Sequence, residues 1–194
     1  KNRTLSIIHP YNQWQVVEFY DKYKYSILYL CHQSKYSLRK PRKIAQYFYY
    51  RDRLHRKLSG HESDKVELFF NEYENLKTYF SYEKYSNIYK FYEDYRYQRA
   101  EKKFKHLVKF DLQSCFDSIY THTISWATAG WADKVKVLPG YHGSWLGDAF
   151  DNLMQSVNAR ETNGIAIGPE FSRIFAEIIL QYIDQKVEQE LLNK

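Results

Sequence analysis

The apolar residues of this chain change their spacing near residue 104. Over much of residues 12–97 they recur every three or four positions, which is the period of an amphipathic helix. From Phe104 to Leu112 apolar and polar residues alternate instead, as they do in a β-strand. A helical period returns afterwards and is clearest beyond Pro169. This order predicts a helix-rich α+β fold.

Capping residues, prolines and glycines set the expected element boundaries. The stretch 3–10 should be the end of a strand followed by a turn, and it should precede a helix over 12–34 with Asn12 as its N-cap. Pro41 should open a second helix that ends at Gly60. Two more helices are expected before residue 104, one over 64–80 and one from Ser81 or Ser86 to 97. A strand at 104–112 and a short helix at 114–120 should follow. After an irregular stretch at 128–143, the last two helices are expected over 144–159 and 169–192.

Positive charge and tyrosine are both concentrated toward the amino-terminal end. Residues 1–60 contain 13 Lys and Arg but 3 Asp and Glu, whereas residues 61–194 contain 16 and 20. Of the 20 tyrosines, 17 lie between Tyr11 and Tyr97. So much aromatic surface argues against a disordered tail, and the basic balance favours a polyanionic partner.

The basic residues are densest between Arg39 and Lys57. Eight Lys and Arg and one acid, Asp52, occur there, interleaved with four aromatic residues at 47–50. Such a run is either a solvated helix face or a surface that follows phosphates and stacks bases, and its charge density favours the second. The predicted nucleic-acid contacts are Arg39, Lys40, Arg42, Lys43, Arg51, Arg53 and Arg56.

A carboxylate stands at the end of the strand expected at 104–112. Asp111 is followed five residues later by an aromatic residue, Phe116. A carboxylate on a rigid strand suits a pair of hard cations, and the carbonyl of Leu112 can add an oxygen ligand. A ring packed beneath a bound sugar would exclude a 2′-hydroxyl by overlap. Taken alone, however, Asp111 is more simply a solvent-facing carboxylate.

Two longer segments resemble a known family. Phe110-Asp-Leu-x-x-Cys-Phe-x-Ser-Ile119 resembles the first palm motif of reverse transcriptases. Thr162-Asn-Gly-Ile-Ala-Ile-Gly-Pro-Glu-Phe-Ser-Arg-Ile-Phe-Ala-Glu177 resembles the second. With the run Ser-Ile-Tyr-Thr-His at 118–122, the chain is most similar to the bacterial defence-associated, abortive-infection group. Residues 3–7 resemble the fingers motif whose arginine holds the incoming triphosphate.

The resemblance implies a right-hand polymerase fold, with fingers at 1–103 and part of the palm at 104–194. A fingers-side insertion is expected around 127–160. The implied activity is RNA-directed DNA synthesis in anti-phage defence, with two Mg²⁺ ions, for which Mn²⁺ can substitute. The implied partners are dNTPs and RNA or DNA. The resemblance leaves open whether a non-coding RNA or a partner protein joins the chain. It also leaves open whether the chain forms an oligomer and whether a tyrosine serves as the primer.

The resemblance also assigns roles to individual residues. Asp111 and Leu112 would hold metal, and Phe116 would be the gate that selects deoxynucleotides. Gly168 would lie against the nascent base pair, and Arg3 would contact phosphate. Ser172 and Arg173 would meet template or primer.

Two departures from the family pattern stand beside these matches. Ala166 occupies a position where this group often has proline, and the third palm motif, an aromatic-x-Asp-Asp turn, does not occur in the sequence. We expect that motif beyond Lys194 and the fingers lysine region before Lys1, so these residues alone should not polymerise. The alternative is a catalytically inactive polymerase-fold subunit that binds nucleic acid or scaffolds an assembly.

Cysteine content and hydropathy bear on the cellular compartment. Two cysteines cannot form a disulfide framework, and no apolar run approaches the roughly 18 residues of a membrane span. We therefore expect a cytoplasmic protein without membrane contact. The histidines and cysteines show no zinc-ligand spacing, so zinc is not expected.

Overall fold

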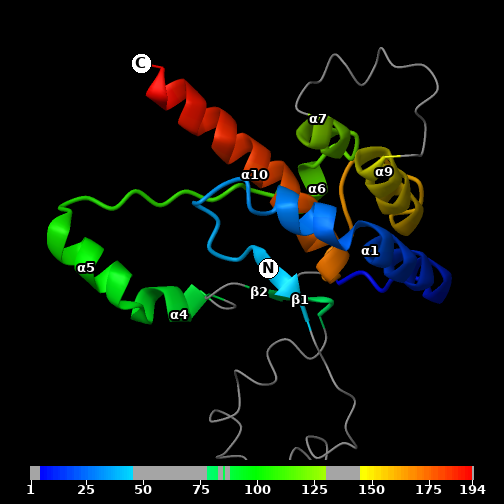
Figure 1. Cartoon of the computed structure of the whole chain (residues 1–194), viewed down its shortest axis with the longest axis horizontal. Coiled ribbons are helices and arrows are strands. Elements are labelled where there is room, and N and C mark those ends of the chain that lie inside the picture. Colours follow the sequence, from blue (N-terminus) through cyan, green and yellow to red (C-terminus); the bar gives the residue numbers. More distant parts are fainter. Residues whose placement is uncertain (1–4, 46–77, 83–84, 86–87, 130–144, 194) are drawn as a thin grey trace, which may run out of the picture.

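Four helices of the computed structural model surround a core of aromatic and aliphatic side chains (Figure 1). The structure describes residues 5–45, 78–82, 85, 88–129 and 145–193. Its elements mix helices with a two-stranded sheet, so the predicted helix-rich α+β composition is confirmed. They are α1 (Pro10–Leu30), β1 (Pro41–Ile44), β2 (Phe80–Tyr82), α4 (Ile88–Glu93), α5 (Tyr95–Lys103), α6 (Cys115–Ser118), α7 (Thr123–Ala129), α9 (Leu146–Val157) and α10 (Glu170–Leu192).

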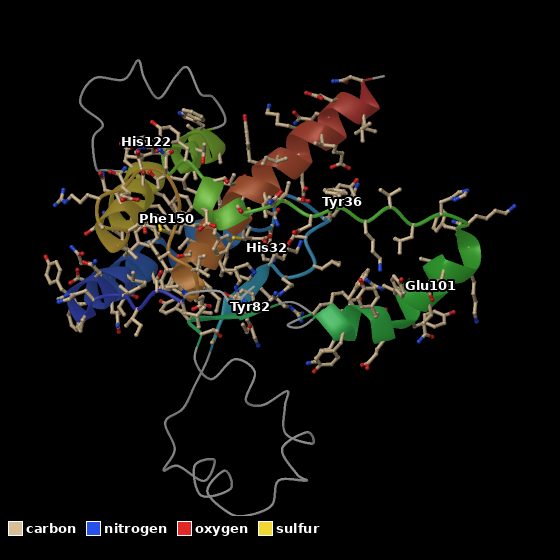
Figure 2. The ribbon with its side chains drawn as sticks, turned by 180° about the vertical axis from the view of Figure 1, so that it is seen from behind. His32, Tyr36, Tyr82, Glu101, His122 and Phe150 are labelled. Atoms are coloured by element: carbon tan, nitrogen blue, oxygen red, sulfur yellow. The ribbon has the colours of Figure 1, made fainter. Side chains whose placement is uncertain are left out.

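Phenylalanine rings in mutual contact join three of the core helices. The ring centroid of Phe19 on α1 lies 4.7 Å from that of Phe150 on α9. The centroid of Phe150 lies 4.7 Å from that of Phe171 and 4.9 Å from that of Phe175, both on α10. All four side chains are buried, and Phe150 is labelled in Figure 2. Tilted and edge-on ring pairs of this kind add to the stabilisation that comes from buried area alone.

Helix α10 follows the sequence prediction closely. It begins at Glu170, directly after Pro169, and ends at Leu192. Ile174, Phe175 and Ile178 in its first half are buried. Its second half projects from the core toward the carboxyl end of the chain (Figure 1). The local signals that define a long helix, a proline at its start and a sustained period, are sufficient here.

The helix expected to begin at Pro41 is wrong, because this segment is strand β1. Pro41, Lys43 and Ile44 pair with Tyr82, Ser81 and Phe80 of β2 in an antiparallel hairpin. Proline is tolerated at the first position of an edge strand, where no ladder hydrogen bond needs its missing N–H. Phe80 was also expected in a helix. The rest of the two predicted helices, residues 46–77, lies outside the described residues.

The strand expected at 104–112 is not formed among the described residues. This segment is an extended connection between α5 and α6 (Figure 1), and its side chains are exposed, Val108 and Phe110 by 83% and 87%. Alternation sets the directions of side chains, but a strand also needs a neighbour that pairs with its backbone. Residues 5–9, at the expected first strand, likewise form none.

Helix boundaries differ from expectation where side chains find distant or competing partners. Helix α1 begins at Pro10 rather than after Asn12, and His9 Nδ1 accepts a hydrogen bond from the Tyr11 N–H. Asn12 instead donates to the Ser156 carbonyl at 2.9 Å, which ties α1 to the end of α9. The expected helix up to residue 97 is divided at Asp94, whose carboxylate caps α5.

Helix α7 was not predicted, whereas α6 and α9 lie inside their predicted ranges. Most of the irregular stretch expected at 128–143 and the centre of the expected insertion at 127–160 lie outside the described residues. None of the described helices combines the length and the apolar character needed to cross a bilayer.

Candidate functional site

Backbone hydrogen bonds join the two segments that resemble palm motifs. The N–H of Thr121 donates to the Thr162 carbonyl, and the N–H of Gly164 donates to the Ile119 carbonyl, each at 2.8 Å. Tyr120 and Asn163 between them form an antiparallel bridge. Segments more than 40 residues apart in the sequence therefore lie side by side.

A third hydrogen bond of this pairing involves the predicted gate residue. The carbonyl of Phe116 accepts from the Ile165 N–H at 2.8 Å. Its ring is partly buried and packs against the core that α1, α9 and α10 share. Because backbone and ring are both held, Phe116 has a defined position next to the second segment.

Gly164 allows these two segments to approach closely. Its φ of +84° lies in a region that L-residues with a side chain rarely adopt. A Cβ at this position would lie 3.3 Å from the Asp117 carbonyl oxygen. The Gly164 carbonyl also accepts from Asn158 Nδ2 at 3.0 Å. The sequence pattern at 162–164 indicated a turn but not this contact.

The amino-terminal segment meets the same loop. The Ser6 N–H donates to the Ile167 carbonyl at 2.8 Å. The next residue, Gly168, has a φ of +118°, and a Cβ there would lie 3.3 Å from Leu5 Cδ2. Arg3 lies outside the described residues, yet the side chain of Leu5, two residues beyond it, lies against Gly168.

The predicted metal ligands lie on the exposed connection before α6. Asp111 is exposed, and Leu112 is 55% exposed. Burial, and to a smaller extent the negative charge of Asp111, raise the pKa of the Cys115 thiol. In the part of the chain that the structure describes, no three His, Cys, Asp or Glu side chains gather as a metal site.

Asp111 and Leu112 nevertheless fit magnesium by their donor chemistry. Mg²⁺ binds hard oxygen ligands and commonly takes one or two carboxylates together with phosphate oxygens of a substrate. One exposed carboxylate and an adjacent carbonyl leave room for such a substrate. The donor types of this pair are therefore compatible with Mg²⁺.

A histidine–aspartate pair, which the sequence analysis missed, anchors the turn after the first motif. His122 Nδ1 is hydrogen bonded to Asp151 Oδ2, and Gln155 Nε2 donates to Asp151 Oδ1 at 2.7 Å. Asp151 is buried on α9, and His122 is labelled in Figure 2. A buried carboxylate needs such partners, because an unpaired charge in the core is strongly unfavourable. Twenty-nine residues separate the pair, and no local pattern marks it.

The β1–β2 hairpin is held at the start of α10 by Glu170. Glu170 Oε2 accepts from the Tyr79 N–H at 2.7 Å, and its Oε1 accepts from the Tyr82 hydroxyl. The Arg173 guanidinium lies over the Tyr82 ring, 3.6 Å from its centroid. Burial and the charge of Glu170 raise the pKa of Tyr82, so its hydroxyl stays protonated as a donor.

Two predicted nucleic-acid contacts lie in this region of α10. Ser172 is completely buried, which is incompatible with the predicted contact to template or primer. The reason is its position on the core side of α10, between Phe171 and the buried Ile174. Arg173 is partly exposed and already stacks on Tyr82.

The basic residues around the hairpin differ in how far their side chains are exposed. Arg39, Arg42 and Lys43 are exposed, and the last two lie on β1. Lys40 is less exposed, and its ammonium group donates to the Ser34 carbonyl at 3.1 Å. The other predicted contacts, at positions 51, 53 and 56, lie outside the described residues.

Comparison of the chain with protein-family models, curated proteins and solved structures finds no significant match.

Proposed function

We propose that this chain forms the fingers and part of the palm of a reverse-transcriptase-like DNA polymerase. The observation that carries the proposal is the meeting of three segments at one place. Residues 116–121 pair with residues 162–165, and Ser6 pairs with Ile167. These are the three segments that resemble nucleotide-binding motifs, and nothing in their sequence spacing requires them to be adjacent.

In this proposal several residues together position a deoxynucleoside triphosphate, and each has a separate role. Phe116, fixed by its backbone and by core packing, excludes a ribose 2′-hydroxyl. Gly168 exposes bare backbone to the base pair, and Arg3 binds the triphosphate. Asp111 and the Leu112 carbonyl would hold Mg²⁺, which supplies positive charge for the transferring phosphoryl group. Catalysis is then mainly positioning and charge stabilisation.

The exposed cations on β1 would supply affinity for the nucleic-acid backbone. Arg42 and Lys43 face solvent on a hairpin that Glu170 fixes to the start of α10. Contacts to phosphate add affinity that falls as salt concentration rises, but they carry no base specificity. Defence against phage is the setting in which we place this activity, by resemblance.

The second candidate function is a polymerase-fold subunit without turnover. The observation that favours it is that, among the described residues, the exposed Asp111 belongs to no cluster of three or more His, Cys, Asp or Glu side chains. Such a subunit would keep the three-segment arrangement and bind RNA or DNA through the basic hairpin. It would incorporate no nucleotide with either Mg²⁺ or Mn²⁺.

Incorporation of labelled dNTPs by the complete polymerase that contains this chain separates the two functions. Asp111→Ala should abolish synthesis, while Asp117→Ala, which removes an exposed carboxylate six residues away, should preserve it. Phe116→Ala should admit ribonucleotides in a competition between dNTPs and rNTPs. Undiminished synthesis by Asp111→Ala would refute the polymerase assignment. A wild-type protein that binds oligonucleotides but incorporates nothing would favour the second candidate.

A further inference from the structure

Helix α1 carries an exposed aromatic stripe that the proposed polymerase function does not use. Tyr11, Trp14, Tyr25 and Tyr29 are between 64% and 71% exposed. With Glu18 and Lys22 between them, they recur in steps of three or four residues, which places all six on one helix face. Tyr11 and Tyr29 are five turns, or about 27 Å, apart. We call these six residues the α1 stripe.

The composition of the α1 stripe fits a protein partner better than a nucleic acid. Its one acid and one base cancel, whereas a surface for a polyanion needs an excess of cations. Tyrosine and tryptophan are enriched at the centres of protein interfaces. The Trp14 indole N–H donates to Glu18 Oε1 at 2.8 Å, so the polar edge of this ring is satisfied while its apolar surface stays exposed.

The order of residues in the α1 stripe is complementary to itself. When two copies of α1 lie antiparallel and cross at Tyr20, Glu18 stands opposite the partner's Lys22. In the same register Tyr11 stands opposite the partner's Tyr29, and Trp14 opposite the partner's Ser26. We propose that two copies of this chain associate through the α1 stripe in this register, with two-fold symmetry.

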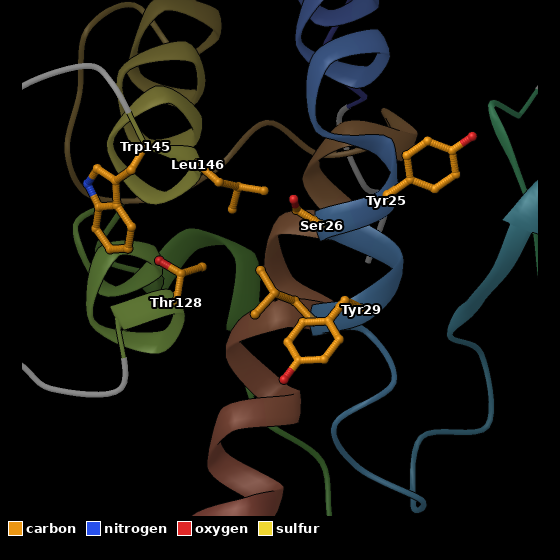
Figure 3. Close-up of a pocket in the computed structure, with 7 residues that line it drawn as sticks. Tyr25, Ser26, Tyr29, Thr128, Trp145 and Leu146 are labelled. Carbon is orange, nitrogen blue, oxygen red and sulfur yellow. The ribbon is translucent and has the colours of Figure 1, made fainter.

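A groove beside the α1 stripe lies where this register needs it. It has a volume of about 380 Å³ and separates Ser26 and Tyr29 of α1 from Thr128, Trp145 and Leu146 on the other side (Figure 3). The partner's Trp14, opposite Ser26, stands at its mouth. An aromatic anchor that enters a pocket is the usual centre of binding energy, and the symmetry supplies it twice.

The exposed area of the stripe is sufficient for a reversible dimer. An aromatic side chain buries about 150–250 Å² when fully covered, so four that are about two-thirds exposed offer roughly 400–650 Å² per copy. Two copies would bury roughly 800–1,300 Å². This range includes the ~1,000 Å² expected of a specific interface.

Charge reversal tests the register by sedimentation velocity of the 194-residue chain between about 1 and 100 μM. The wild type should form a dimer of twice 23.6 kDa. Glu18→Lys and Lys22→Glu should each weaken it at least tenfold, because like charges then face each other. An equimolar mixture of the two variants, and the double variant, should dimerise again. Val17→Ala, an exposed apolar position off the stripe, is the matched control and should preserve the dimer.

Four results would overturn the proposal. The first is a wild type that stays monomeric throughout, and the second is a dimer that neither reversal weakens. The third is a monomeric wild type whose affinity for a labelled oligonucleotide falls in Trp14→Ala or Tyr29→Ala, which would assign the stripe to nucleic acid. Failure of the mixture to recover the dimer would equally refute this register, provided that circular dichroism shows both variants folded. None of these measurements depends on DNA synthesis, so a result that refutes the dimer leaves the polymerase proposal untouched.

Discussion

Replacement of Gly164 by alanine should destabilise the chain through a single backbone position. Gly164 is held on two sides, because its N–H donates to the Ile119 carbonyl and its carbonyl accepts from Asn158. It cannot shift to make room without breaking one of these bonds. An added Cβ would meet the Asp117 carbonyl oxygen at 3.3 Å and would require an alanine at a φ of +84°.

The magnitude follows from three contributions. Left-handed backbone costs an L-residue about 1–2 kcal/mol. Overpacking against a backbone carbonyl adds about 1–3 kcal/mol when neither group can move. The smaller conformational entropy of alanine in the unfolded chain offsets about 0.4–1 kcal/mol. We expect a net loss of about 3 kcal/mol, which for a chain of this length lowers Tm by about 6–12 °C.

Thermal and urea unfolding of Gly164→Ala and the wild type measure this loss. Arg160→Gly is the matched control, because Arg160 also has a positive φ, of 65°, but is exposed. There the relief of backbone strain and the gain in unfolded-state entropy oppose each other, so its stability should change by less than about 0.5 kcal/mol. A Tm for Gly164→Ala within about 1 °C of the wild type would refute the close approach of the two motif segments.

Two further predictions concern Glu170 and Asp111. Glu170→Gln should lower the free energy of unfolding in urea by about 1.5–3 kcal/mol, because an amide cannot accept hydrogen bonds from Tyr79, Phe80 and Tyr82 as the carboxylate does. A change below about 0.5 kcal/mol would mean that other contacts hold the hairpin. Asp111→Asn removes a negative charge that helps raise the pKa of Cys115, so alkylation of Cys115 at pH 8 should become faster, and an unchanged rate would contradict their proximity. Cys31, which is fully buried, serves as the unreactive internal reference.

Elements defined by local signals were predictable, and those defined by distant partners were not. Helix α10 needed only Pro169 and a period sustained over its length. Strand β1 was missed because its partner β2 lies about 40 residues later and Glu170, which fixes that hairpin, lies almost 90 residues beyond β2. Alternation at 104–112 predicted a strand, but no strand forms there because the alternation does not supply a pairing partner.

The candidate site shows the same division. Phe116, Gly164 and Gly168 could be singled out as turn or packing residues, but their mutual contacts depend on backbone pairing between distant segments. Ser172 was assigned to a surface because the resemblance carried it there, whereas the helical phase of α10 buries it. The pairing of His122 with Asp151 had no sequence signal, although His122 ends the run at 118–122, since only the packing of α9 brings the two side chains together.

The hydrogen bond between Ser6 and Ile167 has a consequence for the order in which the protein folds. Its two residues are 161 positions apart, so this contact closes a loop that contains most of the chain. During synthesis at about 5–20 residues per second, the amino-terminal segment waits roughly 8–32 seconds before Ile167 exists. The core helix α1 can form in that interval, but the candidate site cannot. Assembly of the nucleotide-binding segments is therefore a late event, and a ribosome stalled before residue 167 would carry α1 without a site.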